Sequence, residues 1–119
     1  MLQKQSFFAP TDSSGIFKVK VIQTRRCSPR KHAKIGRFLR VVIKSTKARF
    51  LKKRKRRIRA LVVRSKHFTY KNDGVVYRFI DNTGVLLRRR MNTLGKETYG
   101  PTSKQLKIKK FKKSFLVLF

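Results

Sequence analysis

The sequence predicts a mainly β protein: a small closed barrel of five strands with a projecting basic ribbon or loop and short C-terminal helices. Two observations lead to this prediction. Three runs rich in Val, Ile, Tyr and Phe, at 58–65, 75–80 and 85–87, are separated by turns at Asn72-Asp73-Gly74 and at 81–84. Asp-Gly between such runs is a strong hairpin signal, and the glycine of each turn stands where a reversing chain needs positive φ. We therefore expect an antiparallel meander here, within a sheet whose closure removes exposed edges.

Two strands with an alternating pattern are predicted upstream, at 16–23 and 36–44, after a strand-like lead at residues 2–9. In both strands apolar side chains recur at every second position, which is typical of a strand with one buried face. The side chains that we expect to face inward are Phe17, Val19, Val21, Leu39, Val41 and Ile43. Most of the positions between them are Lys or Arg, so the outer faces of both strands should be basic.

The chain after the meander is predicted to contain a loop, a short helix and an apolar tail. Ser103 can cap a helical segment at about 103–113, and Leu106 and Phe111 would face inward from it. The last residues, 114–119, are expected to pack against the barrel as a hydrophobic tail.

Charge is the unusual property of the sequence. Lys and Arg number 34 against 4 Asp and Glu, which gives a net charge of +30 and a pI near 11.9. Self-repulsion at this charge opposes compaction, and a dense polyanion would relieve it, so we expect nucleic acid as the partner. The 119 residues show no linker and no internal repeat, so we expect one domain over residues 1–119.

Basic clusters lie in the predicted loops and at element ends, where long cationic side chains can reach phosphates. Such contacts set position and affinity but carry little base information. If about eight phosphates are neutralised, log affinity should fall against log salt with a slope of about −6 to −7. The candidate RNA-binding residues are Arg25, Arg26, Arg30, Lys31, Arg49, Lys52, Lys53, Arg54, Lys55, Arg56, Arg57, Arg64, Lys66, Arg88, Arg89 and Arg90.

Aromatic rings are interleaved with this charge. Phe50 and Phe68 lie in loop-like surroundings and could stack on an unpaired base, although anchoring a loop or filling a core is the commoner use of such rings. Most of the aromatic side chains are expected to alternate inward.

No residue pattern supports catalysis, a metal site or another cofactor. His32 and His67 are far apart, there is a single cysteine, and no pair of residues has metal-ligand spacing. Asp12, Asp73 and Asp81 fall in turns, where aspartate accepts hydrogen bonds from its own backbone. We therefore expect neither enzyme activity nor a cofactor.

The predicted meander also carries a spaced motif of small, aliphatic and turn residues. Its members are Ala60, Leu61-Val62-Val63, Asp73-Gly74, Phe79, Asn82 and Val85-Leu86. This motif resembles the signature of large-subunit ribosomal protein L fourteen, a family found in all ribosomes. Further similar segments follow in the same order and spacing, namely Met1-Leu2-Gln3, Asp12-Ser13-Ser14-Gly15, Ile35-Gly36 and Tyr99-Gly100-Pro101.

The resemblance implies a small five-stranded barrel with a structural role in the large ribosomal subunit. It implies that the barrel sits on large-subunit rRNA near the subunit interface, and packs against ribosomal proteins of the L three and L nineteen families. It also implies contact with small-subunit rRNA in an intersubunit bridge. No membrane partner is expected, because no apolar run approaches the ~20 residues needed to span a bilayer. The loop at 47–57, which includes Arg49, and the segment 95–101 are the regions expected on the interface side.

One departure from the family pattern concerns protein docking. Where the family has Thr-Arg after the glycine, this chain has Lys96-Glu97. In many members that patch and the C-terminal helix dock a ribosome-silencing factor, so the candidate docking residues are Lys96, Glu97, Tyr99 and Lys113. The reversed charge at Glu97 either weakens such docking or predicts a co-adapted partner.

Two alternatives belong to other functional classes. A free-standing barrel that binds single-stranded nucleic acid would need exposed aromatic rings on one sheet face. A cationic membrane-active protein would need an amphipathic helix with a wide apolar face, and Leu106, Ile108 and Phe111 make only a narrow one.

Composition points to a compartment. The ten Phe and the many Lys, against few Ala, are what an AT-rich gene would encode, and organelle genomes are often AT-rich. We therefore expect a mitochondrial ribosome, with a plastid or a bacterial cytoplasm as the alternatives.

Overall fold

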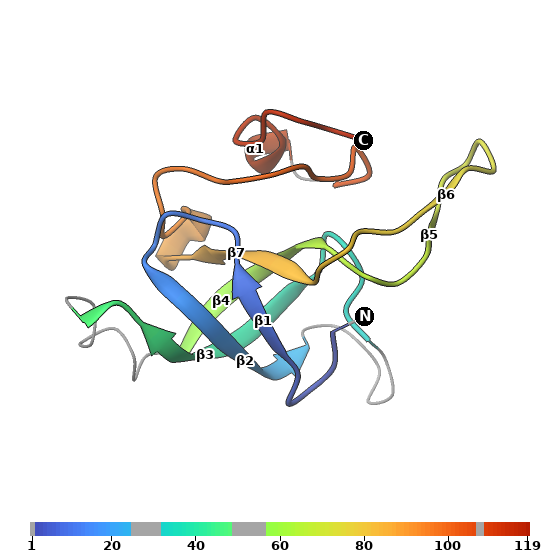
Figure 1. Cartoon of the computed structure of the whole chain (residues 1–119). Helices are drawn as coiled ribbons and strands as arrows, with labels where there is room; N and C mark the ends of the chain where they lie inside the picture. Colours follow the sequence, from blue (N-terminus) through green and yellow to red (C-terminus); the bar gives the residue numbers. More distant parts are fainter. Residues whose placement is uncertain (1, 25–31, 49–56, 107–108) are drawn as a thin grey trace.

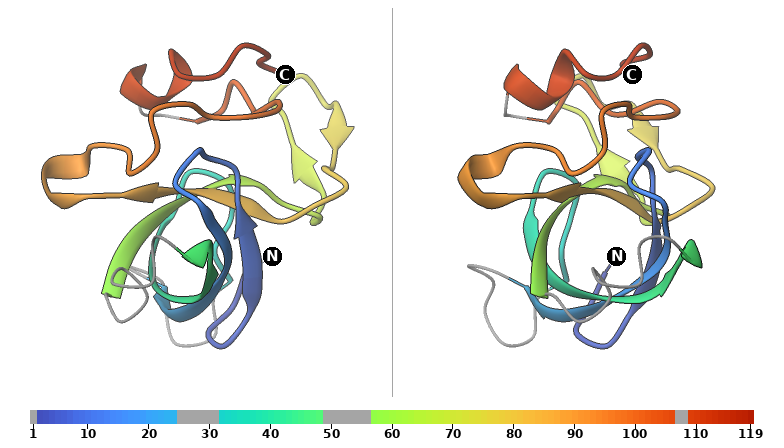
Figure 2. Two further views of the ribbon diagram at one scale, coloured as in Figure 1. Left: turned by 60° about the vertical axis from the view of Figure 1, so that its left-hand side comes forward. Right: turned by 90° about the vertical axis from the view of Figure 1, so that its left-hand side faces the viewer.

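Five strands of the chain close into a barrel in the order β1–β2–β3–β4–β7, and the two views of Figure 2 show them curling into a ring. The computed structural model (Figure 1) describes residues 2–24, 32–48, 57–106 and 109–119. The strands are β1 (Phe7–Pro10), β2 (Ile16–Thr24), β3 (Phe38–Thr46), β4 (Arg57–Arg64), β5 (Thr69–Tyr70), β6 (Val76–Tyr77) and β7 (Thr83–Leu87). A short 3-10 helix, Arg89–Met91, and the helix α1, Lys109–Lys112, follow. The predicted fold class is confirmed.

A parallel pair between the first and last barrel strands closes the ring. Ala9 of β1 lies opposite Thr83 of β7, whereas all other barrel pairs are antiparallel. Thr11 extends the closure, because its backbone N–H donates to the carbonyl of Gly84 at 3.0 Å. Each of the five strands therefore has a partner strand on both sides.

Aliphatic side chains fill the barrel interior. The predicted inward set on β3, Leu39, Val41 and Ile43, is buried, as are Val19 and Val21 on β2. The interior cluster consists of Leu2, Phe8, Ile16, Val19, Val21, Ala33, Leu39, Val41, Ile43, Ala60, Val62 and Leu86. A barrel of this size is therefore a packed core, not a channel.

A second core lies outside the barrel wall, beneath the C-terminal chain that crosses over β4 and β7 in Figure 1. Alternate residues of β4 and β7 face this layer, which explains their unbroken apolar runs: each strand is buried on both faces. The buried members are Leu61, Val63, Val85, Leu87, Leu106, Phe111 and Phe115.

The expected three-stranded meander is wrong. β4 pairs directly with β7, with Leu61 opposite Val85, and residues 65–82 leave the barrel as a separate hairpin, β5–β6 (Figure 1). The Asp73-Gly74 turn is confirmed, but it closes the tip of this side hairpin, with Gly74 at φ 83. The second apolar run does not join the barrel, and Ile80 within it is 95% exposed. A turn signal specifies a local reversal, not which larger sheet the strands join.

The turn expected at 81–84 is also wrong, because Thr83 and Gly84 belong to β7. Gly84 does not adopt positive φ. A Cβ at this position would lie 2.8 Å from the carbonyl oxygen of Leu61 and 3.0 Å from the ring of Phe8. Glycine is needed here for close approach of the strands and not for turn conformation.

The prediction that Phe17 of β2 faces inward is wrong. The pairing of β2 with β3 shifts register between Ile16 and Val19, as at a β-bulge, and the alternation of faces breaks there. Ile16 is buried instead, and Phe17 is 56% exposed. The N-terminal lead is shorter than expected: β1 begins at Phe7, while Leu2 makes an isolated bridge to Ala33.

The C-terminal chain packs as predicted at two positions and differs at others. Leu106 and Phe111 are buried, but the helix described is only Lys109–Lys112. The Ser103 hydroxyl accepts a hydrogen bond from the backbone of Gln105 at 3.2 Å, within a turn that precedes that helix. In the tail Phe115 is buried, whereas Leu116 is 99% exposed, so only part of the tail packs on the barrel.

Candidate nucleic-acid interface

The predicted RNA-binding residues fall into four groups by position. Arg57, Lys66, Arg88 and Arg90 are exposed, Arg64 is buried, and the side chain of Arg89 is not described. The remaining candidates lie outside the described residues, namely Arg25, Arg26, Arg30, Lys31, Arg49, Lys52, Lys53, Arg54, Lys55 and Arg56.

Arg64 is an internal clamp. Its guanidinium donates to both carboxylate oxygens of Asp81, at 3.1 and 3.3 Å, and to the hydroxyl of Thr11 at 3.1 Å. It also donates to the carbonyls of Tyr99 and Pro101, at 3.0 and 3.2 Å. All three guanidinium nitrogens are thereby engaged within the protein, and the side chain is 11% exposed. We therefore remove Arg64 from the RNA-binding set.

Sequence reasoning recognised the basic outer faces of β2 and β3, but of the residues below it included only Arg57 in the site. Six cationic side chains stand on the outer surface of three adjacent strands, and we call them the cationic strand face. They are Lys18 and Lys20 of β2, Arg40 and Lys44 of β3, and Arg57 and Arg59 of β4. The alternating pattern of 16–23 and 36–44 was the signal that could have identified them.

The strand registers align these cations in rows across the sheet. Arg40 of β3 lies directly opposite Arg59 of β4. In the next row Val42 lies between Lys20 and Arg57. Like charges directly opposite each other on an antiparallel pair are destabilising, so the Arg40–Arg59 pair needs a counter-charge.

The protein itself does not supply that counter-charge within the described residues. The one ion pair among them joins Arg64 to Asp81, away from the cationic strand face. Asp12 accepts hydrogen bonds from the backbone of Ser14 and Leu86, and Asp73 accepts one from Val75. The carboxylate of Glu97 is hydrogen-bonded to Tyr99.

The loop after β7 brings further arginines to the same region. The guanidinium of Arg59 contacts the sulfur of Met91 at 4.0 Å, so the 3-10 helix Arg89–Met91 lies beside β4. Arg88 and Arg90, both exposed, flank this contact. The backbone N–H of Arg88 donates to the carbonyl of Asn92 at 2.7 Å, which closes the loop. Sheet and loop cations therefore form one region.

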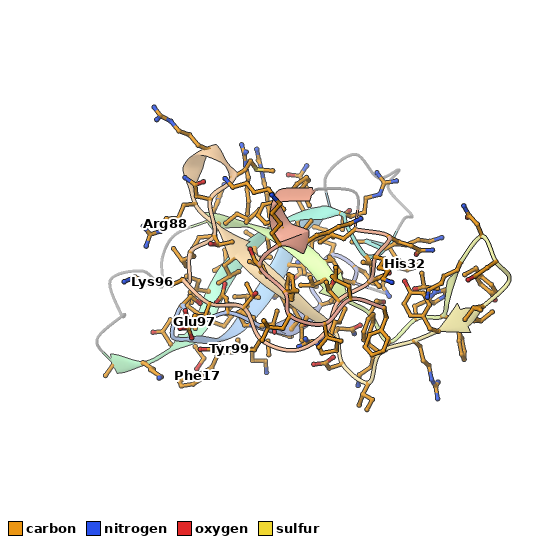
Figure 3. All side chains as sticks on the ribbon, turned by 90° about the horizontal axis from the view of Figure 1, so that it is seen from above. Phe17, His32, Arg88, Lys96, Glu97 and Tyr99 are labelled. Atoms are coloured by element: carbon orange, nitrogen blue, oxygen red, sulfur yellow. The ribbon has the colours of Figure 1, made fainter. Side chains whose placement is uncertain are left out.

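Three of the predicted protein-docking residues, Lys96, Glu97 and Tyr99, lie near one another in Figure 3, which views the molecule from above. Lys96, Glu97, Tyr99 and Lys113 are exposed. The backbone of Glu97 exchanges hydrogen bonds with Ser13, at 3.0 and 3.1 Å. The hydroxyl of Thr98 donates to the carbonyl of Ser114, the residue after Lys113. We call these four exposed residues the docking patch.

The electrostatics of the docking patch centre on Tyr99. Its hydroxyl donates to a carboxylate oxygen of Glu97 at 3.3 Å. Loss of hydration, and then the negative charge of Glu97, raise the pKa of the Tyr99 phenol above its ordinary value. The phenol therefore stays protonated and can keep donating well above neutral pH.

Aromatic side chains are more exposed than predicted. Phe7, Phe17, Phe68, Tyr70 and Tyr99 are all about half exposed or more. They lie at three places, on β1 and β2, on the side hairpin and in the docking patch, instead of on one sheet face. Phe50, the other candidate for stacking, lies outside the described residues.

In the described part of the chain, no three His, Cys, Asp or Glu side chains converge so as to hold a metal ion. No helix of those residues is long and apolar enough to cross a membrane.

The chain matches a known protein family. The family described as ribosomal protein L14p/L23e matches residues 1–117, which is nearly the whole chain.

Proposed function

The chain belongs to the ribosomal protein L14p/L23e family of the large ribosomal subunit, and we propose that it binds large-subunit rRNA through the cationic strand face and the adjoining loop arginines. The family serves a structural role in the subunit. The segments that lie outside the described residues contain most of the predicted cationic residues and would add further phosphate contacts.

The pairing of Arg40 with Arg59 carries this proposal. Two guanidinium groups on directly opposed residues repel each other, and the described acidic residues lie elsewhere. An RNA backbone laid across β3 and β4 would turn that repulsion into two favourable contacts, since arginine binds phosphate with a two-pronged fork. The surface is rigid because it stands on barrel strands whose inner side chains are buried.

The test is the salt dependence of binding to a fragment of large-subunit rRNA. Replacing Arg40 and Arg59 with Gln should lower the magnitude of the log–log slope by about 2, since each lost phosphate contact removes about one unit. Lys113→Gln removes one charge from the docking patch and serves as the control, with an unchanged slope. An unchanged slope in the double variant would refute a role for this face.

We also propose that the docking patch faces protein neighbours and the subunit interface. Lys96, Glu97 and Tyr99 project from a segment that is held in place by hydrogen bonds to residues 11–13. Such preorganisation favours docking, because less freedom is lost on binding. Ribosomal proteins of the L three and L nineteen families and small-subunit rRNA are the proposed neighbours. A ribosome-silencing factor is a further proposed neighbour. Glu97→Arg should strengthen the binding of a factor that is adapted to the usual family sequence.

We propose a mitochondrial ribosome as the location, on the basis of composition alone. Sedimentation of a tagged copy through a low-magnesium gradient tests the ribosomal role, and fractionation of organelles tests the compartment. Comigration with free large subunits is expected. A position at the top of the gradient, with binding to any single strand, would favour the free-standing barrel instead.

A further inference from the structure

The side hairpin β5–β6 is held firmly although it stands outside the barrel. At its base the backbone N–H of Phe79 donates to the carbonyl of Ser65 at 3.1 Å. Further out, the hydroxyl of Tyr77 bonds to the hydroxyl of Ser103, and the side-chain amide of Gln105 donates to the carbonyl of Tyr70 at 2.9 Å. A two-stranded hairpin is marginal by itself, so these anchors to the C-terminal chain fix its position.

Two exposed aromatic residues lie two positions apart in the first arm of this hairpin. Phe68 precedes β5 directly and is 50% exposed, and Tyr70 ends β5 and is 71% exposed. Residues two apart on an extended chain share a face and lie roughly 7 Å apart. The guanidinium of Arg78 lies 5.1 Å from the centre of the Phe68 ring, which adds a positive charge beside the aromatic surface.

Phe68 and Tyr70 are also among the residues that line a groove of about 990 Å³ between the hairpin and the body of the protein. Three lysines of this groove, Lys34, Lys71 and Lys104, come from three separate parts of the chain. Among the described residues that line it, Asp73 supplies the one carboxylate, and this carboxylate already accepts a hydrogen bond from Val75. The groove therefore combines exposed ring faces with unbalanced positive charge.

We propose that this groove binds a short single-stranded segment of RNA, with bases stacked on Phe68 and Tyr70 and phosphates held by the three lysines. The inference rests on the proposed function as an RNA-binding protein and assigns a second, chemically distinct site. The cationic strand face offers charge for phosphates, whereas the hairpin offers rings that only unpaired bases can reach. Stacking tolerates any base, so the site selects strand state and not sequence.

The charge pattern favours RNA over a protein segment as the occupant. A protein strand that paired with the edge of a hairpin would use backbone groups and would have no need of lysines from three parts of the chain. A phosphate backbone uses all three, and rings spaced two residues apart along one strand match the way that sheet aromatics stack successive bases.

The experiment compares two RNA ligands of the full chain: a labelled oligouridylate of about ten nucleotides and a duplex of the same length. Phe68→Leu with Tyr70→Leu keeps apolar bulk but removes both rings. Affinity for the oligouridylate should fall by at least about tenfold, since each stacked base contributes about 5- to 150-fold, and affinity for the duplex should not change. Phe17→Leu, at an equally exposed ring on β2, is the matched control and should lower neither affinity.

A direct readout comes from fluorescence, because the chain has no tryptophan and three tyrosines. Oligouridylate should quench the emission of the native protein, and Tyr70→Leu should remove most of that quenching. An unchanged oligouridylate affinity in the double variant, or an equal loss on the duplex, would refute the inference while leaving the proposed function standing. Failure of the native chain to bind either RNA would instead refute the proposed function. Normal RNA affinity with loss of incorporation into large subunits would assign the hairpin to a protein neighbour, and would also refute the inference.

Discussion

Replacing Arg64 with Met should destabilise the fold strongly without changing the salt dependence of RNA binding. The side chain links β4 to three other segments through Thr11, Asp81 and the carbonyls of Tyr99 and Pro101. Methionine keeps the apolar stem but leaves these groups without their donor. Because the guanidinium at the centre of this network is nearly buried, this single substitution should cause a large loss of stability.

The magnitude follows from the surroundings of the two charges. Removing one partner of a buried, hydrogen-bonded ion pair costs about 3–5 kcal/mol. Asp81 is 51% exposed and can regain water, which lowers the cost. We therefore expect the free energy of unfolding to fall by about 3 kcal/mol and Tm by about 10 °C.

The assay is urea denaturation followed by circular dichroism, in moderate salt that screens self-repulsion. Arg59→Met is the matched control, since it removes an exposed cation from the same strand and should change stability by less than about 0.5 kcal/mol. If the two variants lose equal stability, the clamp does not hold these segments together. If Arg64→Met instead lowers the slope of the salt dependence, Arg64 contacts phosphate after all.

Three further predictions concern a glycine, the second core and a phenol. Gly100→Ala should lower the free energy of unfolding by about 2 kcal/mol or more, because φ is 75 and a Cβ would lie 2.4 Å from Nη1 of Arg64. Gly74→Ala, at φ 83 in open space, should lower it by only about 1 kcal/mol. Equal losses in urea denaturation would contradict the clash with Arg64. Leu106→Ala should lower the free energy of unfolding by about 3 kcal/mol in the same assay, whereas Leu116→Ala, at a fully exposed position, should leave it unchanged. If Leu106→Ala also left it unchanged, the C-terminal chain would not seal the second core. Glu97→Gln should lower the pKa of Tyr99 toward its ordinary value, because it removes a negative charge that disfavours the phenolate. Ultraviolet titration measures this change, and an unchanged pKa would mean that Glu97 does not contribute to it.

The fold class and much of the core were predictable because they depend on short-range patterns. Alternation at every second residue identified Leu39, Val41 and Ile43 as buried. The pattern failed at Phe17, where a register shift in the pairing with β3 exchanges the faces. A bulge depends on the partner strand as much as on the strand itself, so alternation alone does not reveal it.

The candidate site was predictable in its charge and less so in its geometry. Net charge identified nucleic acid as the expected partner, and the basic clusters gave a set of candidate residues. The strand register placed Arg40 opposite Arg59, and this pairing is the reason that we propose the cationic strand face as a site. Arg64 carries the same charge as its neighbours in sequence, yet its surroundings turn it inward.

The sequence by itself determined strands β2, β3 and β4, the Asp73-Gly74 turn and the basic outer faces of β2 and β3, because each of these depends on residues close together in the chain. It also identified the family, through motifs that follow one another along nearly the whole chain. Tertiary structure decided that β4 pairs with β7, that the intervening residues form a side hairpin, and that the C-terminal chain covers one part of the barrel wall and leaves another free. It also decided the role of Arg64, whose partners Thr11 and Pro101 lie 53 and 37 residues away. Such contacts form only when the closed barrel brings distant segments together, and local sequence patterns carry no record of them.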